Sequence, residues 1–161
     1  MYNKFNLFFL TLLNIGKIKY APGTIASLMT CLFFLFFINF VSIIYIFIGT
    51  LLVFLYSFVA INNSFDAFDS NDPQEIVIDE FVGQMLPLLA IPVYETLYLA
   101  PQEYYLVASF LLFRLFDIWK PFPINYIDQN TEGAMGIMLD DIVAGFFATI
   151  LLTAIFFFLG G

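Results

Sequence analysis

The stretch from Leu28 to Ile61, LMTCLFFLFFINFVSIIYIFIGTLLVFLYSFVAI, contains no charged residue in 34 positions. As one continuous helix it would span about 50 Å, whereas the hydrocarbon core of a bilayer is only about 30 Å thick. We therefore predict two short membrane spans joined by a tight turn near Asn39–Ser42. The exact break point, and whether both segments cross fully, are left open by the pattern.

The composition of the whole chain agrees with a membrane protein. Of its 161 residues, 62% are hydrophobic and 11% are charged, whereas soluble domains average about 45–50% apolar and about 25% charged. Its five Lys and Arg residues form no basic stripe, so we expect no nucleic acid partner. Histidine is absent, which excludes imidazole ligands and His-based acid–base catalysis. Cys31 is alone, which excludes a disulfide framework within the chain.

Three further apolar segments follow, at Phe81–Val93, Tyr104–Trp119 and Asp140–Phe158. Pro87 and Pro92 interrupt the first, and Lys120-Pro121 should end the second, because a residue before proline is pushed toward extended geometry. The short apolar stretch Phe5–Leu13 predicts an interfacial helix. We therefore expect an all-α fold: a polytopic helical membrane bundle of four to five short spans with an N-terminal interfacial helix, forming one domain over residues 1–161.

The lysines near the N-terminus predict the orientation of this bundle. Lys4, Lys17 and Lys19 precede the first span, which places the N-terminus on the cytoplasmic side. Counting spans then puts the connection before Glu80 and the loop before Asp140 on that same side. Only the Asn39 turn and the Tyr94–Glu103 loop should lie on the opposite side. The polar clusters described next therefore all face the cytoplasm.

Two of these clusters stand at the starts of apolar segments. Pro22-Gly23-Thr24, with Ser27 one turn on, is an ordinary helix start, and on the residues alone this capping interpretation is favoured. Its free N–H groups and the Thr24 hydroxyl could also bind a phosphate. Asp79-Glu80 lies directly beside the apolar run from Phe81, where charge is costly unless it is paired or bound to a metal. A helix cap and a metal ligand remain equal alternatives for this pair.

Two more clusters lie near the ends of the last two spans. Arg114, Asp117 and Lys120 recur every three residues, roughly along one helix face. Arg114 should face the bundle interior and pair with an anion, either Asp117 alone or a substrate phosphate. Asp140-Asp141 follows a polar loop that contains Gly133 and Gly136, at the expected N-terminal end of the last span. The two adjacent carboxylates repel each other, and a cation would relieve this repulsion.

Together the clusters provide five carboxylates, two cations and a candidate phosphate cradle on one membrane face. This combination is typical of metal-assisted phosphoryl transfer or hydrolysis, in which Mg²⁺ polarises the phosphate. A cation or proton transporter using the same carboxylates is the alternative, but transport would place them near mid-bilayer on broken helices. A non-catalytic assembly subunit, a third possibility, would not need the clusters to converge.

As a set, the clusters resemble the phosphatidylglycerophosphatase A family. The resemblance rests on four blocks in order, Pro22-Gly23-Thr24, 76–83, 113–124 and 136–145. Three positions depart from the family pattern: Lys19 stands in place of a proline, Ala26 in place of a glycine, and Gly133-Ala134 in place of a glycine pair. The resemblance implies a multi-pass phosphatase of the bacterial inner membrane. It would use Mg²⁺ to hydrolyse the lipid phosphatidylglycerophosphate to phosphatidylglycerol and phosphate.

The resemblance implies the substrate and the reaction, and from the residues themselves we infer a role for each member of the clusters. Metal ligation is expected of Asp79, Glu80, Asp140 and Asp141, which would hold one or two Mg²⁺ ions. Asp117 would complete the metal shell or orient a water molecule. Substrate binding is expected of Arg114 and Lys120 at the phosphate, with Gly23, Thr24 and Ser27 forming its cradle. Besides this substrate, membrane lipids are the expected partners, and no oligomeric state is predicted.

Overall fold

A computed structural model of the chain describes residues 4–64, 68, 74–98 and 101–159, and all regular structure in these ranges is helical. The elements are α1 (Lys4–Leu10), the 3-10 turn η1 (Ile15–Lys17), α2 (Pro22–Phe37), α3 (Ile43–Ser64), α4 (Ile78–Leu89), α5 (Ile91–Tyr98), α6 (Gln102–Trp119), α7 (Ile124–Asn130) and α8 (Gly133–Leu159). The predicted all-α class is confirmed.

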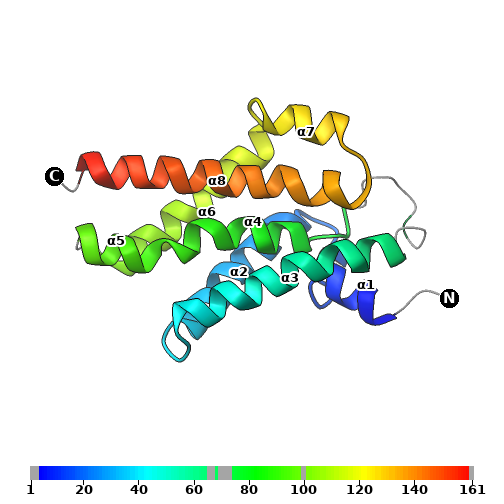
Figure 1. Cartoon of the computed structure of the whole chain (residues 1–161), viewed down its shortest axis with the longest axis horizontal. Helices are drawn as coiled ribbons and strands as arrows, with labels where there is room; N and C mark the ends of the chain where they lie inside the picture. The colour runs from blue at the N-terminus through cyan, green and yellow to red at the C-terminus, as the bar shows by residue number, and fades with distance from the viewer. Residues whose placement is uncertain (1–3, 65–67, 69–73, 99–100, 160–161) are drawn as a thin grey trace.

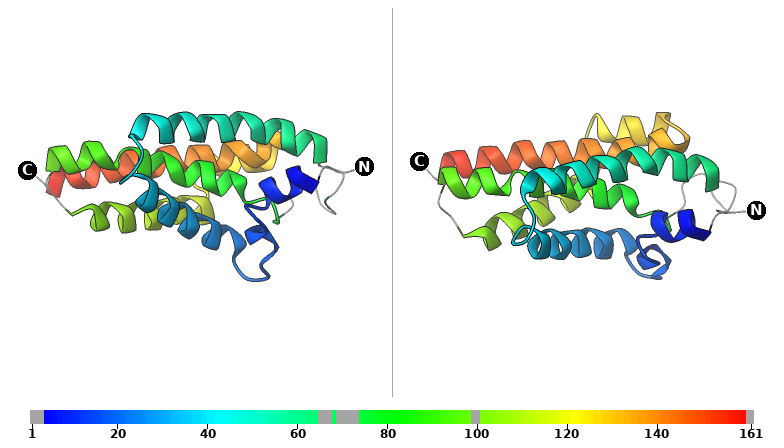
Figure 2. Two further views of the ribbon diagram at one scale, coloured as in Figure 1. Left: turned by 90° about the horizontal axis from the view of Figure 1, so that it is seen from below. Right: turned by 60° about the horizontal axis from the view of Figure 1, so that its bottom comes forward.

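The helices lie roughly along one long axis, with α4 at the centre of the bundle (Figure 1). α4 packs against α8 on one side and against α2 and α3 on the other, while α6 contacts both α4 and α8. α5 continues the direction of α4 toward the C-terminus, and the two termini lie at opposite ends of the molecule (Figures 1 and 2). α4 and α8 both begin near the end that holds the N-terminus. We call this the cavity end, and the end near the C-terminus the far end.

Two helices, α3 and α8, are long and apolar enough to cross a membrane, judged by length and composition, and α2 is a shorter apolar helix. α3 presents a row of exposed apolar side chains, Ile44, Tyr45, Phe47, Ile48, Leu51, Leu52, Leu55 and Val59. A surface of this kind is covered by lipid in a membrane protein. The turn predicted near Asn39–Ser42 is confirmed, because α2 ends at Phe37 and α3 begins at Ile43.

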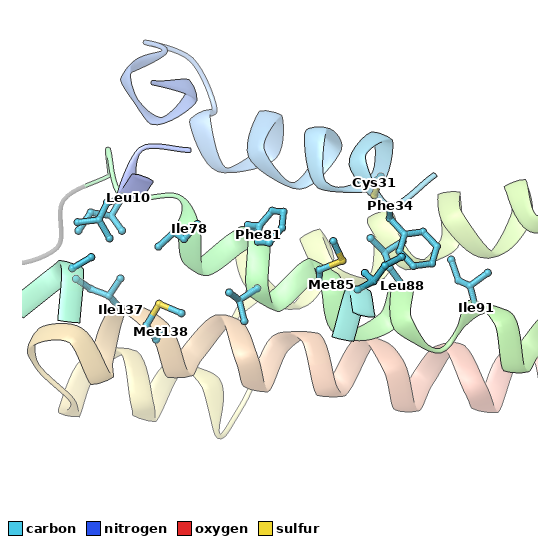
Figure 3. Close-up of a cluster of buried hydrophobic side chains, with 14 of the residues drawn as sticks. Leu10, Cys31, Phe34, Ile78, Phe81, Met85, Leu88, Ile91, Ile137 and Met138 are labelled. Carbon is cyan, nitrogen blue, oxygen red and sulfur yellow. The ribbon is translucent and has the colours of Figure 1, made fainter. Parts of the chain in front are cut away.

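The buried core lies between α2, α4 and α8. Figure 3 shows Cys31 and Phe34 of α2 beside Met85 and Leu88 of α4, with Met138 of α8 on the opposite side of α4. All five side chains are fully buried. Burying a large apolar side chain contributes about 1.5–3 kcal/mol. This packing fixes the position of α4, whose first turn lies at the cavity end.

The start of the last helix differs from the prediction. α8 begins at Gly133, not at Asp140, so Asp140 and Asp141 lie two turns inside it. Gly133 has a φ of 67°, a backbone conformation that glycine adopts without strain and that turns the chain back from α7. The residues between Gly133 and Asp140 carry no charge and continue the helix. The predicted polar loop is also wrong before this point, because Ile124–Asn130 forms α7.

Two other boundaries differ. The segment Phe81–Val93, predicted as one interrupted span, is divided between α4 and α5 at Ala90, with Pro92 in the first turn of α5, where its missing N–H is tolerated. α5 continues to Tyr98, so the predicted Tyr94–Glu103 loop is largely helical. The predicted N-terminal helix exists but ends at Leu10, because the three residues 12–14 have positive φ.

Candidate active site

A cavity of about 470 Å³ opens at the cavity end of the bundle. It is lined by Lys19, Ala21, Pro22, Gly23, Thr24, Gln74, Ile76, Asp79, Glu80, Arg114, Asp117, Ile118, Lys120, Asp140 and Asp141. We call it the main cavity. All the site residues predicted from the sequence line it except Ser27, which lies against Arg114. Four segments that are far apart in the sequence therefore meet around one space.

Three carboxylates form a compact group in this cavity. Asp79, Glu80 and Asp141 each offer one oxygen, and these oxygens all lie within 4.8 Å of one another. We call this group the carboxylate triad. Oδ1 of Asp79 and Oε2 of Glu80 are buried and have no hydrogen-bond partner. Buried carboxylate oxygens are costly when unpaired, and oxygen ligands suit Mg²⁺, so the group fits a hard divalent cation.

Two glycines bring the members of the carboxylate triad together. Gly83 lies one turn after Asp79 on α4, and Gly145 lies one turn after Asp141 on α8. A Cβ atom on Gly83 would lie 2.6 Å from the carbonyl oxygen of Asp141, and one on Gly145 would lie 2.3 Å from the carbonyl oxygen of Gly83. Small residues allow membrane helices to approach closely. Any side chain at these positions would push α4 away from α8 and separate the carboxylates.

Arg114 extends from α6 toward the first turns of α2. Its Nη1 atom forms an ion pair with Asp117 and lies 3.4 Å from the Ser27 hydroxyl, to which it donates a hydrogen bond. Ser27 in turn donates to the carbonyl oxygen of Gly23 over 2.9 Å. The Nε atom of Arg114 is buried without a partner. The pair with Asp117 therefore exists but does not satisfy the guanidinium, and Ser27 orients it.

Gly23 joins the start of α2 to the carboxylate triad. A Cβ atom there would lie 2.0 Å from Oε1 of Glu80 and 3.3 Å from Nη1 of Arg114. The backbone of the first turn of α2 thus lies directly against both an acidic and a basic side chain. Thr24 follows in the same turn and lines the main cavity. The predicted phosphate cradle is consequently continuous with the candidate metal ligands.

Lys120 connects a second group of acidic residues. It ends α6 in a left-handed conformation, with a φ of 46°, and its ammonium contacts Asp128 of α7 and, at 2.8 Å, Oδ2 of Asp140. Burial lowers the pKa of Lys120, but the hydrogen bonds to Asp128 and Asp140 outweigh this effect and raise the pKa overall. The ammonium therefore stays charged. Asp140 lies in this group and outside the carboxylate triad, and its Oδ1 atom is buried without a partner.

Sequence reasoning missed three residues at this site. Lys19 and Gln74 line the main cavity, and Asp128 binds Lys120 from α7. Lys19 was informative only for orientation, and Asp128 was expected in an irregular loop. No spacing rule links Asp128 to Lys120, because Pro121 and Pro123 separate them.

Comparison with known proteins adds a family and three relatives. The family model described as phosphatidylglycerophosphatase A matches residues 8–156. A phosphatidylglycerophosphatase A of Haemophilus influenzae is 36% identical over 140 residues, which cover 87% of this chain and 82% of the relative. The protein of that name from Escherichia coli is 41% identical over 90 residues, 56% of this chain and 46% of its own.

The third relative has a different name. A Bacteroides thetaiotaomicron protein with the provisional name phosphatidylinositol-3-phosphatase is 31% identical over 140 residues, 85% of this chain and 84% of its own. Among solved structures there is no significant match. The four sequence blocks that carry the family resemblance all lie within the matched range 8–156.

Proposed function

The chain belongs to the phosphatidylglycerophosphatase A family, and on that premise we propose that it hydrolyses the phosphomonoester of phosphatidylglycerophosphate to phosphatidylglycerol and phosphate. The observation that carries this proposal is the main cavity, where the carboxylate triad lies beside Arg114. Both groups keep buried polar atoms without partners. A divalent cation and a phosphate would satisfy them together.

The carboxylate triad is the proposed Mg²⁺ site. Asp79, Glu80 and Asp141 supply the oxygen ligands. Asp140, which contacts Lys120, directly precedes Asp141 in the chain. When bound there, Mg²⁺ supplies Lewis-acid polarisation of the phosphoryl group. Five carboxylates line the main cavity against three cations, and this excess of negative charge favours a divalent cation over an empty site.

The scissile phosphate is proposed to lie between Arg114 and the first turn of α2. The unpaired Nε atom of Arg114 points to a missing acceptor, and guanidinium groups bind phosphate oxygens through several N–H groups at once. The N–H groups of Gly23 and Thr24 lie in the first turn of α2, where intrahelical partners are lacking. Ser27 acts as a positioning residue, since its hydroxyl is shared between Arg114 and Gly23.

The reaction adds water across one phosphorus–oxygen bond. The water oxygen attacks phosphorus, the bond to the glycerol oxygen breaks, and the departing alcohol takes up a proton. Asp117 is the proposed residue for orienting the water, because it lies beside Arg114 on the wall of the main cavity. Lys120, held by Asp128 and Asp140, offers a positive charge that stabilises negative charge developing on the phosphate.

The apolar helices and the family together support a membrane protein. We propose five crossings, by α2, α3, α4 with α5, α6 and α8, with α1 lying on the membrane surface. Lys4, Lys17 and Lys19 belong to the same end as the main cavity, which supports an active site facing the cytoplasm of a bacterial inner membrane. The transporter alternative has no support, because the carboxylates gather at one end of the bundle.

Phosphate release from phosphatidylglycerophosphate by the purified protein in detergent tests the proposal. We expect release that requires Mg²⁺ and falls at least about 10²-fold in Asp141→Asn, because a carboxylate of the proposed metal site is lost. Glu103→Gln is the matched control, since Glu103 is an exposed carboxylate in the first turn of α6. No release by the wild type, or release that a chelator leaves unchanged, would contradict the proposed function.

A further inference from the structure

Lys19 differs from the two other cations that line the main cavity. Arg114 is paired with Asp117, and Lys120 is paired with Asp128 and Asp140. Within the part of the chain that the structure describes, Lys19 has no carboxylate partner, and its ammonium lies 5.7 Å from the centroid of the Tyr20 ring. The main cavity therefore has one positive charge at its wall that the described protein groups do not neutralise.

Lys19 also lines a second, smaller cavity of about 220 Å³. This side cavity is lined by Gly16, Lys17, Ile18, Lys19, Pro22, Gln74 and Glu75. Lys19, Pro22 and Gln74 line both cavities, so the two spaces adjoin at these residues. The side cavity has two lysines against one glutamate, whereas carboxylates outnumber cations in the main cavity. The side cavity thus suits an anionic group that needs no metal.

The exposed residues around Lys19 place it where a lipid could reach it. Tyr20 is 75% exposed and Ile118, which lines the main cavity from α6, is 71% exposed. Tyrosine side chains are enriched at the depth of lipid headgroups, where one end of the ring is wet and the other is apolar. An unpaired lysine at this depth, beside the main cavity, is suited to binding a headgroup phosphate.

The proposed substrate has two phosphates of different chemistry. Its terminal phosphomonoester is the group that is hydrolysed, and a phosphodiester lies one glycerol unit away, next to the diacylglycerol. With the phosphomonoester between Arg114 and the first turn of α2, the phosphodiester remains outside the metal site and keeps its single negative charge. A lysine ammonium is a compact point charge that can bind such a group without fixed geometry.

We propose that Lys19 binds the phosphodiester of the substrate from the junction of the two cavities. It thereby selects phospholipids whose headgroup carries a phosphomonoester beyond a phosphodiester. Phosphatidic acid, which has a phosphomonoester but no phosphodiester, gains nothing from this contact. The inference rests on the proposed function, and Lys19 is one of the positions at which this chain departs from its family pattern.

The test compares two lipids with the same acyl chains on the detergent-purified, full-length protein with Mg²⁺. The KM and kcat are measured for phosphatidylglycerophosphate, and phosphatidic acid is titrated as a competitor to obtain its inhibition constant. For Lys19→Gln we expect the KM for phosphatidylglycerophosphate to rise about tenfold, the size of one lost charge-assisted hydrogen bond. We expect kcat and the inhibition constant of phosphatidic acid to stay unchanged, and Lys19→Arg to restore the KM.

Lys4→Gln is the matched control, because Lys4 is an exposed lysine on α1 that lines neither cavity. It should leave all three constants unchanged. Equal weakening of both lipids by Lys19→Gln would show that Lys19 serves the scissile phosphate, and no weakening would show that it does not contact the substrate. Either result overturns the inference alone. No phosphate release by the wild type would overturn the proposed function, and the inference with it.

Discussion

The two ends of the bundle differ in whether their buried polar groups have hydrogen-bond partners. At the far end, the Tyr94 hydroxyl of α5 lies 2.7 Å from Oγ1 of Thr153, and the Tyr105 hydroxyl of α6 donates to the carbonyl oxygen of Tyr94 over 3.2 Å. The ring of Tyr105 also packs on Phe156, with centroids 4.3 Å apart. At the cavity end, buried atoms of four charged residues lack partners: Asp79, Glu80, Arg114 and Asp140.

This contrast separates the part of the protein built for stability from the part that needs a ligand. An unpaired buried polar group costs about 1–3 kcal/mol, and more when it is charged. Among the described residues of the far end, the Tyr94 and Tyr105 hydroxyls have partners within the protein and avoid this cost. The cavity end bears it, which is expected where a bound cation and a phosphate complete the hydrogen bonds and charge pairs. Substitutions at the two ends should therefore affect different properties.

Replacing Asp79 with Asn should have the largest effect on activity. Phosphate release should fall by about 10³-fold, because one oxygen ligand of the carboxylate triad is lost. The metal-free protein should be no less stable than the wild type, since the change removes repulsion within the triad. Phosphate release and thermal unfolding in chelator measure these effects. A variant that keeps a tenth of the wild-type activity would contradict the proposal that the cavity end needs Asp79 to bind a ligand.

Replacing Arg114 with Lys should lower kcat/KM by about 10²-fold. A lysine keeps the positive charge but lacks the planar guanidinium group, whose fixed N–H donors can bind Ser27 and a phosphate at the same time. Ser27→Ala, which removes only the positioning contact, should have a much smaller effect. Steady-state kinetics on phosphatidylglycerophosphate distinguish the variants. Full activity in the lysine variant would mean that the guanidinium geometry has no catalytic role.

Replacing Gly83 with Ala tests whether close helix packing holds the carboxylate triad together. The added Cβ atom would meet the Asp141 carbonyl oxygen at 2.6 Å, so we expect a loss of about 1–3 kcal/mol in stability. The Mg²⁺ concentration needed for half-maximal activity should also rise. Gly49→Ala on α3 is the matched control, because a Cβ atom there meets nothing within 4 Å. If both variants had the same stability and the same Mg²⁺ requirement, close packing of α4 against α8 would not be needed to assemble the carboxylate triad.

Replacing Tyr94 with Phe should have the smallest effect on activity. The loss of the hydrogen bond to Thr153 should lower the free energy of unfolding by about 1 kcal/mol. Phosphate release should stay at the wild-type level, because Tyr94 does not line the main cavity, where the substrate is proposed to bind. Chemical denaturation and the phosphate assay, run side by side, check both statements. A large loss of activity would show that the far end influences the cavity end and would contradict this separation.

Much of the fold follows from local features of the sequence. The charge-free run and its interruption at Asn39–Ser42 predicted α2 and α3, and Lys120-Pro121 correctly ended α6. The candidate site residues were predicted from their type and position, and the structure brings all of them except Ser27 to the wall of one cavity. Their catalytic roles remain proposals. The motifs were informative because charged residues are rare in this chain, so each one that borders an apolar segment stands out.

The features that escaped prediction depend on tertiary structure. α8 extends back to Gly133 because the chain reverses there with a positive φ, after α7 has packed against it. The contact of Lys120 with Asp128 requires that reversal, and no periodicity predicts it. Adjacent residues on a helix point about 100° apart. Asp141 therefore faces the carboxylates of α4 while Asp140 faces Lys120, which separates Asp140 from the carboxylate triad.

Binding of Mn²⁺, followed by electron paramagnetic resonance on the detergent-purified protein, tests whether Asp79, Glu80 and Asp141 form a divalent-cation site. We predict that the wild type and Glu103→Gln bind Mn²⁺, that Mg²⁺ displaces it, and that Asp141→Asn loses this binding while remaining folded. Binding by Asp141→Asn with the affinity of the wild type, or no binding by the wild type, would contradict the account.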